Sequence, residues 1–495
     1  MKDKKQNKRI NGGHRLLFFC ILCLFGLYVA VSYAEEQPQR EQSKTKVILL
    51  HTDNLTYDQY RHPGAQILTG NVQFQHDGVL MYCDSACFYE ATNSFDAFGH
   101  VKMVQGDTLD LVGDMLLYNG LDQLARVRHN VVLTHRESKL YTDSLDYDRL
   151  YELGYFFEGG KLVDKDNVLT SDWGQYSPPT RQAVFNYNVK LENPKFTLIS
   201  DTLNYNTLTS MAEIVGPSNI DSGDNHIYSE SGFYNTQTEE AILLDRSIVT
   251  NKGRKMVGDS LYYDSKSGVG EGFRNVVYTD EVNKNMLTGN YCYYNDSTGY
   301  SMATDSAVAI DYSQRDTMYM HADTFKVYTF YMDTDSMYRE VRGYHKVRSY
   351  RMDVQSVCDS LVFDSRDTCI TMYRDPIVWN GGQQVLGEVI KVYLNDSTID
   401  RIHVIDQTLS VDRIDSVHYN QVAGKEMTSY FRDGEMYETW VNGNVYVDYY
   451  MFDDDSLMIG LNYTETTELK LFMKDRKMEK IWMPASTGVI YPIVM

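Results

Sequence analysis

The chain has 495 residues, with 47 Lys and Arg against 68 Asp and Glu, and therefore a formal net charge of −21 at pH 7. A charge of this sign and size repels phosphate backbones, which argues against nucleic acid as a partner. The 40 Tyr, only 9 Pro and a hydrophobic share of 43% indicate an ordered, strand-rich chain that buries a large apolar core.

The first 34 residues predict an export signal. Residues 1–15 hold six basic residues and one acid, residues 16–31 are an apolar run, and Ser32-Tyr33-Ala34 is a small-x-small cleavage site. We predict a signal peptide over residues 1–34, cleaved after Ala34, with an uncleaved membrane anchor as the alternative. Cleavage leaves 41 basic and 67 acidic residues, a net charge of −26. Residues 35–46 follow as a polar linker.

A short pattern then recurs along the chain: an acid, often followed by Ser or Thr, an apolar residue two positions on and an aromatic residue four positions on. The twelve intervals average about 30 residues, and five consecutive ones are 29 residues each. A fixed period of this length is typical of repeat architectures, and we predict about thirteen repeats. The acids, or the residues in their place, are Asp53, Asp84, Asp114, Asp143, Asp172, Asp201, Glu230, Asp259, Asn290, Asp323, Asp359, Glu388 and Asp415.

Each repeat is predicted to hold two strands. A turn residue and a branched aliphatic residue precede many of the acids by about 10 to 16 residues, as in Gly70-Asn71-Val72. Within the pattern, Asp143, Leu145 and Tyr147 share one strand parity, whereas Leu140 has the other. A change of parity requires a bulge or a corner, and an Asp side chain suits a corner because it bonds nearby backbone. We therefore predict structural corners at Asp84, Asp114, Asp143, Asp172, Asp201 and Asp259.

These repeats predict one all-β fold, an elongated jelly roll or solenoid, over residues 47–420. Residues 421–495 hold weaker copies, such as Gly443-Asn444-Val445, and are predicted to form divergent C-terminal β repeats or a cap. The five Cys beyond residue 34 are too sparse for a disulfide framework, so we predict that they are apolar fillers. Cys358 and Cys369 are the one pair that we would test for oxidation.

Several of these segments carry a resemblance to a known family. Residues 68–72 (LTGNV) and 142–148 (TDSLDYD) resemble the OstA (organic solvent tolerance) domain of lipopolysaccharide-transport proteins, in the LptA-like branch. Residues 420–431 are similar to the later part of the long OstA-like proteins of Bacteroidetes-type bacteria. The resemblance covers about residues 47–420. It implies a periplasmic bridge that binds the acyl chains of lipopolysaccharide (lipid A) in a hydrophobic interior and conducts them towards the outer membrane. It implies no catalytic residue, cofactor or metal.

A two-sheet roll built from repeats leaves its apolar interior open at both ends. Acyl chains in that interior are stabilised by about 25 cal/mol per Å² of apolar surface removed from water. Edge strands at the two ends are predicted to bind other lipopolysaccharide-transport components by strand addition, with capping by the linker and the C-terminal segment as the alternative. The candidates for lipid-facing positions are Leu145, Tyr147, Leu203, Tyr205, Leu261 and Tyr263, and the alternative is that these residues fill a closed core.

Two other classes of protein stay open at this point: a β-helical protein that binds or processes envelope polysaccharide, and an outer-membrane β-barrel component. Residues 35–495 contain no Gly-x-Ser-x-Gly, His-Glu-x-x-His or Cys-x-x-Cys motif. The acids recur in nearly every repeat instead of marking one or two turns. We therefore expect them to be structural, and we expect no enzymatic activity.

Overall fold

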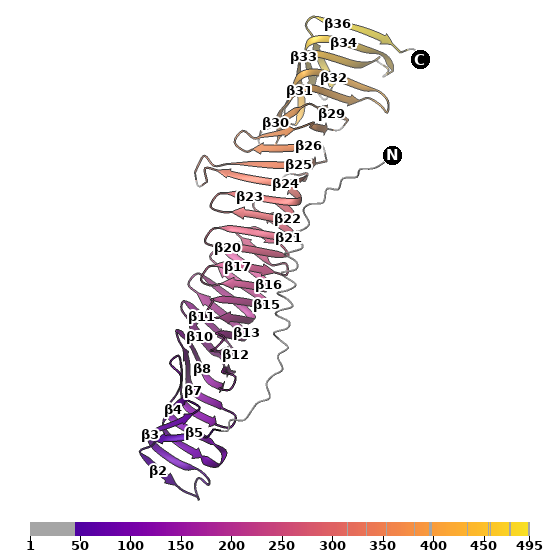
Figure 1. Ribbon diagram of the computed structural model, residues 1–495. Helices are drawn as coiled ribbons and strands as arrows, with labels where there is room; N and C mark the ends of the chain where they lie inside the picture. Colours follow the sequence, from indigo (N-terminus) through magenta and orange to yellow (C-terminus); the bar gives the residue numbers. More distant parts are fainter. Residues whose placement is uncertain are drawn as a thin grey trace, which may run out of the picture.

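The computed structural model describes residues 45–493 except 314, 333, 353, 381, 396, 397, 433, 454, 456, 475 and 476. The predicted signal peptide, with its cleavage site after Ala34, and most of the polar linker lie outside these residues. The described chain is a rod of 36 β-strands with one short 3₁₀-helix, η1 (Glu90–Thr92), and the strands are stacked along the rod in sequence order (Figure 1).

The strands of the first half are β1 (Ile48–His51), β2 (Asn54–Tyr57), β3 (Gln66–His76), β4 (Val79–Tyr89), β5 (Ser94–Gln105), β6 (Leu109–Asn119), β7 (Leu124–His135), β8 (Ser138–Asp148), β9 (Leu153–Phe156), β10 (Gly160–Asp164), β11 (Asn167–Ser171), β12 (Trp173–Ser177), β13 (Gln182–Asn193), β14 (Phe196–Asn206), β15 (Met211–Ser222), β16 (Asn225–Asn235), β17 (Glu240–Leu244), β18 (Ile248–Asn251), β19 (Arg254–Val257) and β20 (Ser260–Asp264).

The strands of the second half are β21 (Val269–Asp280), β22 (Asn285–Asn295), β23 (Tyr300–Asp311), β24 (Met318–Phe330), β25 (Tyr338–Tyr350), β26 (Val354–Asp364), β27 (Cys369–Tyr373), β28 (Ile377–Asn380), β29 (Gln383–Leu386), β30 (Val389–Asn395), β31 (Thr398–Arg413), β32 (Tyr419–Arg432), β33 (Glu435–Phe452), β34 (Met458–Lys474), β35 (Lys477–Trp482) and β36 (Ser486–Pro492).

All strand pairs are antiparallel, and long strands that follow one another in the chain are hydrogen-bonded neighbours, as in β3 with β4 and β4 with β5. Burial alternates along a strand: Val79, Met81 and Cys83 of β4 are buried, and Leu80 and Tyr82 between them point outward. This alternation places one apolar face inside and the other face outside. The all-β, antiparallel prediction is confirmed, and the number of repeats stays a prediction.

A bulge bends most of the long strands near their middle. In β3, Gly70 and Asn71 have φ angles of 85° and 49°, and together they oppose the single residue Asp84 of β4. Gly and Asn tolerate this left-handed backbone better than other residues do. The extra residue restores the inward direction of the apolar side chains beyond the bend. Equivalent pairs with positive φ include Gly99-His100, His129-Asn130, Tyr187-Asn188, Arg274-Asn275, His345-Lys346 and Gly443-Asn444.

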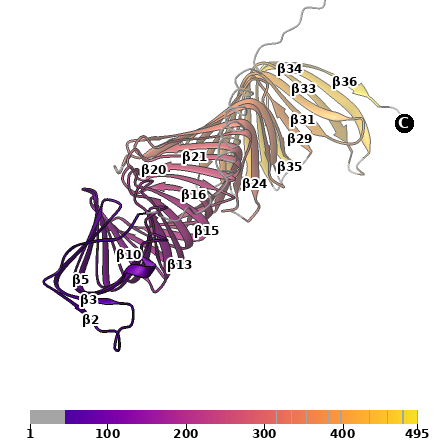
Figure 2. The same cartoon turned by 60° about the horizontal axis from the view of Figure 1, so that its bottom comes forward.

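The bends divide each long strand into two parts, which belong to two half-sheets that face each other. Buried side chains from both half-sheets form the core, which runs along the rod in two clusters, from Val47 to Leu261 and from Val276 to Leu469. Met256 packs against both clusters. Figure 2 shows the stack from another side, with the N-terminal strands towards the viewer. The sheet continues without a change of topology across residue 420, where β31 and β33 both pair with β32.

The five described Cys are free thiols, and four of them are buried. Cys369 of β27 pairs with Asp364 of β26, six residues along that strand from Cys358. Six residues of strand span about 20 Å, well beyond the reach of a disulfide. The pair selected for testing from the sequence is therefore too far apart to bond. In the part of the chain that the structure describes, no helix is long and apolar enough to cross a membrane.

Candidate functional site

The repeat acids lie at the bends, opposite the bulges of neighbouring strands. The main-chain N–H groups of Asp172 and Asp259 each donate to the carbonyl oxygen of the first bulge residue at 3.0 Å. The side chains of five of the acids bond bulge residues, so in Asp172 and Asp259 both the main chain and the side chain hold the bend. The side-chain pairs are Asp84 with His100 at 2.7 Å, Asp114 with Asn130 at 2.7 Å, Asp143 with His129 at 3.2 Å, Asp172 with Asn188 at 2.6 Å and Asp259 with Asn275 at 2.8 Å.

Asp201 occupies the same place in β14, next to Thr202, whose hydroxyl donates to Asn186 Oδ1 at 2.9 Å. The bulge that it faces in β15 contains Gly216, with φ of 92°, in place of an Asn or His. A Gly adopts this conformation without a side-chain bond. The six acids named from the sequence thus all lie at bends, where we propose that they are structural.

The turns between strands form two rows, one along each open side of the folded sheet. The first row contains residues 90–93, 120–123, 149–152, 178–181, 207–210, 236–239, 265–268 and 296–299, and the second contains 77–78, 106–108, 136–137, 165–166, 194–195, 223–224, 252–253 and 281–284. Backbone bonds such as Arg149 N–H to Gln123 O at 3.0 Å join successive turns of the first row, and Arg136 N–H to Thr108 O at 3.1 Å does so in the second. We call the line where the two rows meet the seam.

Buried polar groups join the two rows near the N-terminal end. His76 Nδ1, beside the second row, lies 2.6 Å from the hydroxyl of Tyr118, beside the first. Arg149 donates to that hydroxyl at 2.5 Å and to the carbonyl oxygen of His76 at 3.1 Å. All three side chains are buried. Burial lowers the pKa of His76, although Asp77 lies 3.6 Å from its ring, so the neutral imidazole is favoured in this site.

Similar cross-seam contacts, which we call clasps, recur up to residue 239. Tyr205 donates to Asp164 Oδ2 at 2.8 Å and accepts from Asn167 Nδ2 at 2.9 Å. The partners of most of these clasps are 38 to 47 residues apart, about one and a half repeats. The others are Asn93 with Val47 N–H at 2.8 Å, Gln123 with Asp77 at 2.8 Å, Gln105 with Glu152 at 2.6 Å, His135 with Tyr176 at 2.8 Å, Lys165 with Ser210 at 3.3 Å, and Lys195 with Glu239.

The six lipid-facing candidates lie in the core of the first half, with Leu261 and Tyr263 at its C-terminal end. Leu145, Tyr147, Leu203 and Tyr205 are fully buried, and Leu261 is 3% exposed. Tyr263 is partly buried. Burial raises the pKa of Tyr147, Tyr205 and Tyr263 above the usual tyrosine value. The positions face the interior, and their contact with lipid stays a proposal.

The interior of the second half is packed less completely. Beside the bend of β24, Ala322 and Phe325 are buried, but the next inward residues, Met320 and Val327, are only partly buried. In β6 of the first half, the equivalent residues Leu111 and Tyr118 are both buried. Fifteen partly buried apolar residues pack against the second core cluster and four against the first. Apolar surface near the seam is therefore accessible in the second half.

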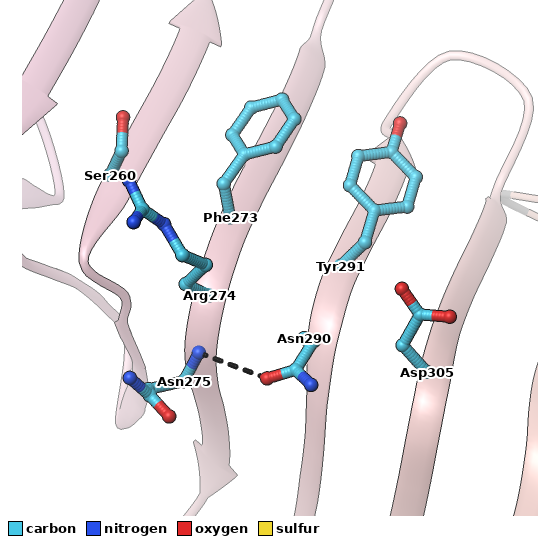
Figure 3. Close-up of a pocket in the computed structure, with 7 residues that line it drawn as sticks. All are labelled: Ser260, Phe273, Arg274, Asn275, Asn290, Tyr291 and Asp305. Atoms are coloured by element: carbon cyan, nitrogen blue, oxygen red, sulfur yellow. Dashed lines mark hydrogen bonds between the residues drawn. The ribbon is translucent and has the colours of Figure 1, made fainter. Parts of the chain in front are cut away.

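A shallow depression of about 680 Å³ lies on the outside of the bend between β20 and β23. Its lining includes the exposed Phe273 and its neighbour Arg274 on β21, Tyr291 on β22 and Asp305 on β23 (Figure 3). Asn290 stands at the acid position of this repeat, and its Oδ1 accepts from the Asn275 N–H at 3.5 Å. This depression is on the opposite side of the sheet from the interior. Among the described residues, no group of three or more His, Cys, Asp or Glu side chains is arranged to hold a metal ion.

The fold and the interior define a class of protein: an elongated antiparallel β roll with an apolar inner surface along its length. Residues 44–201 and 196–259 match the sequence model of the OstA-like protein family, and over residues 44–259 the chain belongs to that family. Membership implies a lipopolysaccharide-transport type of role in general, in the cell envelope and without catalysis. No curated protein matches the chain.

Proposed function

We propose that the protein is a periplasmic bridge that binds the acyl chains of lipopolysaccharide between its two half-sheets and conducts them towards the outer membrane. The observation that carries this proposal is the inward-facing apolar surface, which extends from Val47 to Leu469 and is partly exposed in the second half. Family membership over residues 44–259 supports the same class of cargo. The signal that we predict over residues 1–34 would deliver the chain to the periplasm.

Acyl chains suit this surface because their affinity requires no fixed polar partner. Each buried methylene contributes about 0.8 kcal/mol, so about ten methylenes per chain contribute about 8 kcal/mol before ordering costs. The inward residues of successive strands are mostly aliphatic or aromatic, and neighbouring sites differ little. A chain therefore moves from one site to the next without a deep minimum. The acidic protein repels the phosphorylated head group, which stays outside the half-sheets.

The two ends of the rod suit association with other transport components. At the N-terminal end, Ile48, Leu50, Leu55 and Tyr57 are each about half exposed on β1 and β2. At the C-terminal end, β36 carries exposed Val489, Ile490 and Tyr491. An edge strand with exposed apolar side chains and free backbone groups favours strand addition by a partner. We propose that these partners are other lipopolysaccharide-transport proteins.

Photo-crosslinking in cells tests the function. A photoreactive phenylalanine analogue replaces Met320, which faces inward, and in a matched variant it replaces Tyr319, its outward neighbour. We expect lipopolysaccharide adducts at position 320 and few at 319. Equal labelling at the two positions, or labelling at neither position while a known transport component is labelled in the same cells, contradicts the proposal.

A further inference from the structure

The two halves of the interior differ in how they are closed. We infer that the resting protein holds acyl chains between the half-sheets of β21 to β34, and that the clasps keep the first half closed until they part. This inference rests on the proposed function and adds to it the location of the cargo and the control of its path. It follows from three independent features of the described chain.

The first feature is the distribution of the clasps. The clasps described above lie within residues 45–239, and Lys195 with Glu239 lies at the C-terminal end of this range. These clasps lie beside the first core cluster, which ends at Leu261.

The second feature is the side chains next to the seam. In the first half, the inward residues nearest the seam are large and fully covered, as with Phe74 and Tyr118. Phe196 and Tyr234 also meet across the seam, with ring centroids 4.7 Å apart. In the second half, the residues in equivalent places are partly exposed. They include Leu287, Met320, Val341, Phe363, Ile370 and Val422.

The third feature is in the sequence. The fourth residue after the acid is Tyr in every repeat from Tyr118 to Tyr294, and in the first half its hydroxyl points to the seam and forms clasps in Tyr118, Tyr176 and Tyr205. The next three copies have Val327, Phe363 and Val392 at this position. These side chains have no hydroxyl, so they line the seam with apolar surface that cannot form the clasp.

Photolabelling of the full-length chain tests the inference without altering the protein. The probe is lipopolysaccharide whose acyl chains carry a diazirine, and mass spectrometry maps the adducts after illumination. We expect adducts on inward residues of 269–474 at least about tenfold more often than on those of 66–206, the ratio that 1.4 kcal/mol of closing free energy produces. Equal labelling of the two halves overturns the inference but leaves the proposed function intact. Absence of interior adducts overturns the proposed function, and the inference with it.

A second arm opens the clasps. The triple variant Tyr118→Phe, Tyr176→Phe and Tyr205→Phe removes three hydroxyls and leaves no cavity, so we expect labelling of residues 66–206 to rise several-fold. The matched control changes the outward-facing Tyr82, Tyr141 and Tyr155 to Phe and should leave the labelling pattern unchanged. A folded triple variant with unchanged first-half labelling overturns the role of the clasps. If the triple variant does not fold, as circular dichroism would show, the single variant Tyr176→Phe replaces it, with the same expectation.

Discussion

Two tyrosines at the same repeat position provide a test of the clasps as stabilising interactions. Tyr147 and Tyr205 are both fully buried, both lie four residues after a repeat acid, and both face the seam. Their hydroxyls differ in hydrogen bonding. That of Tyr205 bonds Asp164 and Asn167, whereas that of Tyr147 is buried and has no hydrogen-bond partner among the described residues. Replacement of each by Phe removes only the hydroxyl.

The expected effects differ in size. In Tyr205→Phe, the buried Asp164 keeps its bond from Ser138 at 2.7 Å but loses a donor to its other oxygen. Loss of a hydrogen bond to a buried charged group lowers the free energy of unfolding by about 2 kcal/mol. Tyr147→Phe removes a desolvated hydroxyl that gains nothing from burial. We expect this variant to be neutral or more stable by up to about 1 kcal/mol.

Urea unfolding followed by circular dichroism measures both variants against the unaltered chain. We expect the midpoint to fall for Tyr205→Phe and to stay or rise for Tyr147→Phe, with equal slopes, because neither change alters the surface exposed on unfolding. Equal destabilisation by the two variants would falsify the reasoning, since it would show that the ring environment and not the clasp sets the effect.

Three further predictions follow from the bends, the histidines and the proposed function. Asn130→Ala removes the 2.7 Å bond to Asp114 and places Ala in a left-handed conformation. We expect the free energy of unfolding, measured in urea, to fall by about 1 kcal/mol. A change smaller than the error of the fit contradicts the bend assignment. Burial lowers the pKa of His76 and His135 in the folded chain, so the unfolded chain binds protons first as the pH falls below about 6.5. We therefore expect the free energy of unfolding to be full above that pH and to decrease towards about pH 5, and to decrease less in the double variant His76→Gln, His135→Gln. An equal decrease in the variant and the unaltered chain contradicts the assignment. Depletion of the protein in cells is expected to make the envelope permeable to hydrophobic compounds and to reduce surface lipopolysaccharide, and unchanged surface lipopolysaccharide would favour the polysaccharide class instead.

Much of the fold was accessible from the sequence because its signals are local. The alternation in Val79, Met81 and Cys83 specifies a strand with one buried face. The change of parity around Asp143 predicts a bend, and the structure has a bulge opposite it, at His129 and Asn130. The number of repeats and the domain boundaries are not decided by these signals, since one continuous sheet runs through all of them.

The clasps could not be predicted in the same way, because their partners are distant in sequence. His135 and Tyr176 are 41 residues apart, and neither residue has a local feature that marks it as half of a pair. Six interior positions were predicted from parity alone, which distinguishes inward from outward but does not distinguish a filled interior from an accessible one. A signal was present in the replacement of Tyr by Val327 and Val392, whose meaning depends on knowing that the hydroxyl reaches the seam.

We propose that acyl chains lie between the two half-sheets, and an experimental structure of the full-length chain bound to lipopolysaccharide would show their position. We predict acyl-chain density in contact with Met320, Val341 and Phe363, with the phosphorylated head group outside the seam. Acyl chains bound to the outward face of the strands, or confined to the exposed edges of β1 or β36, would contradict it.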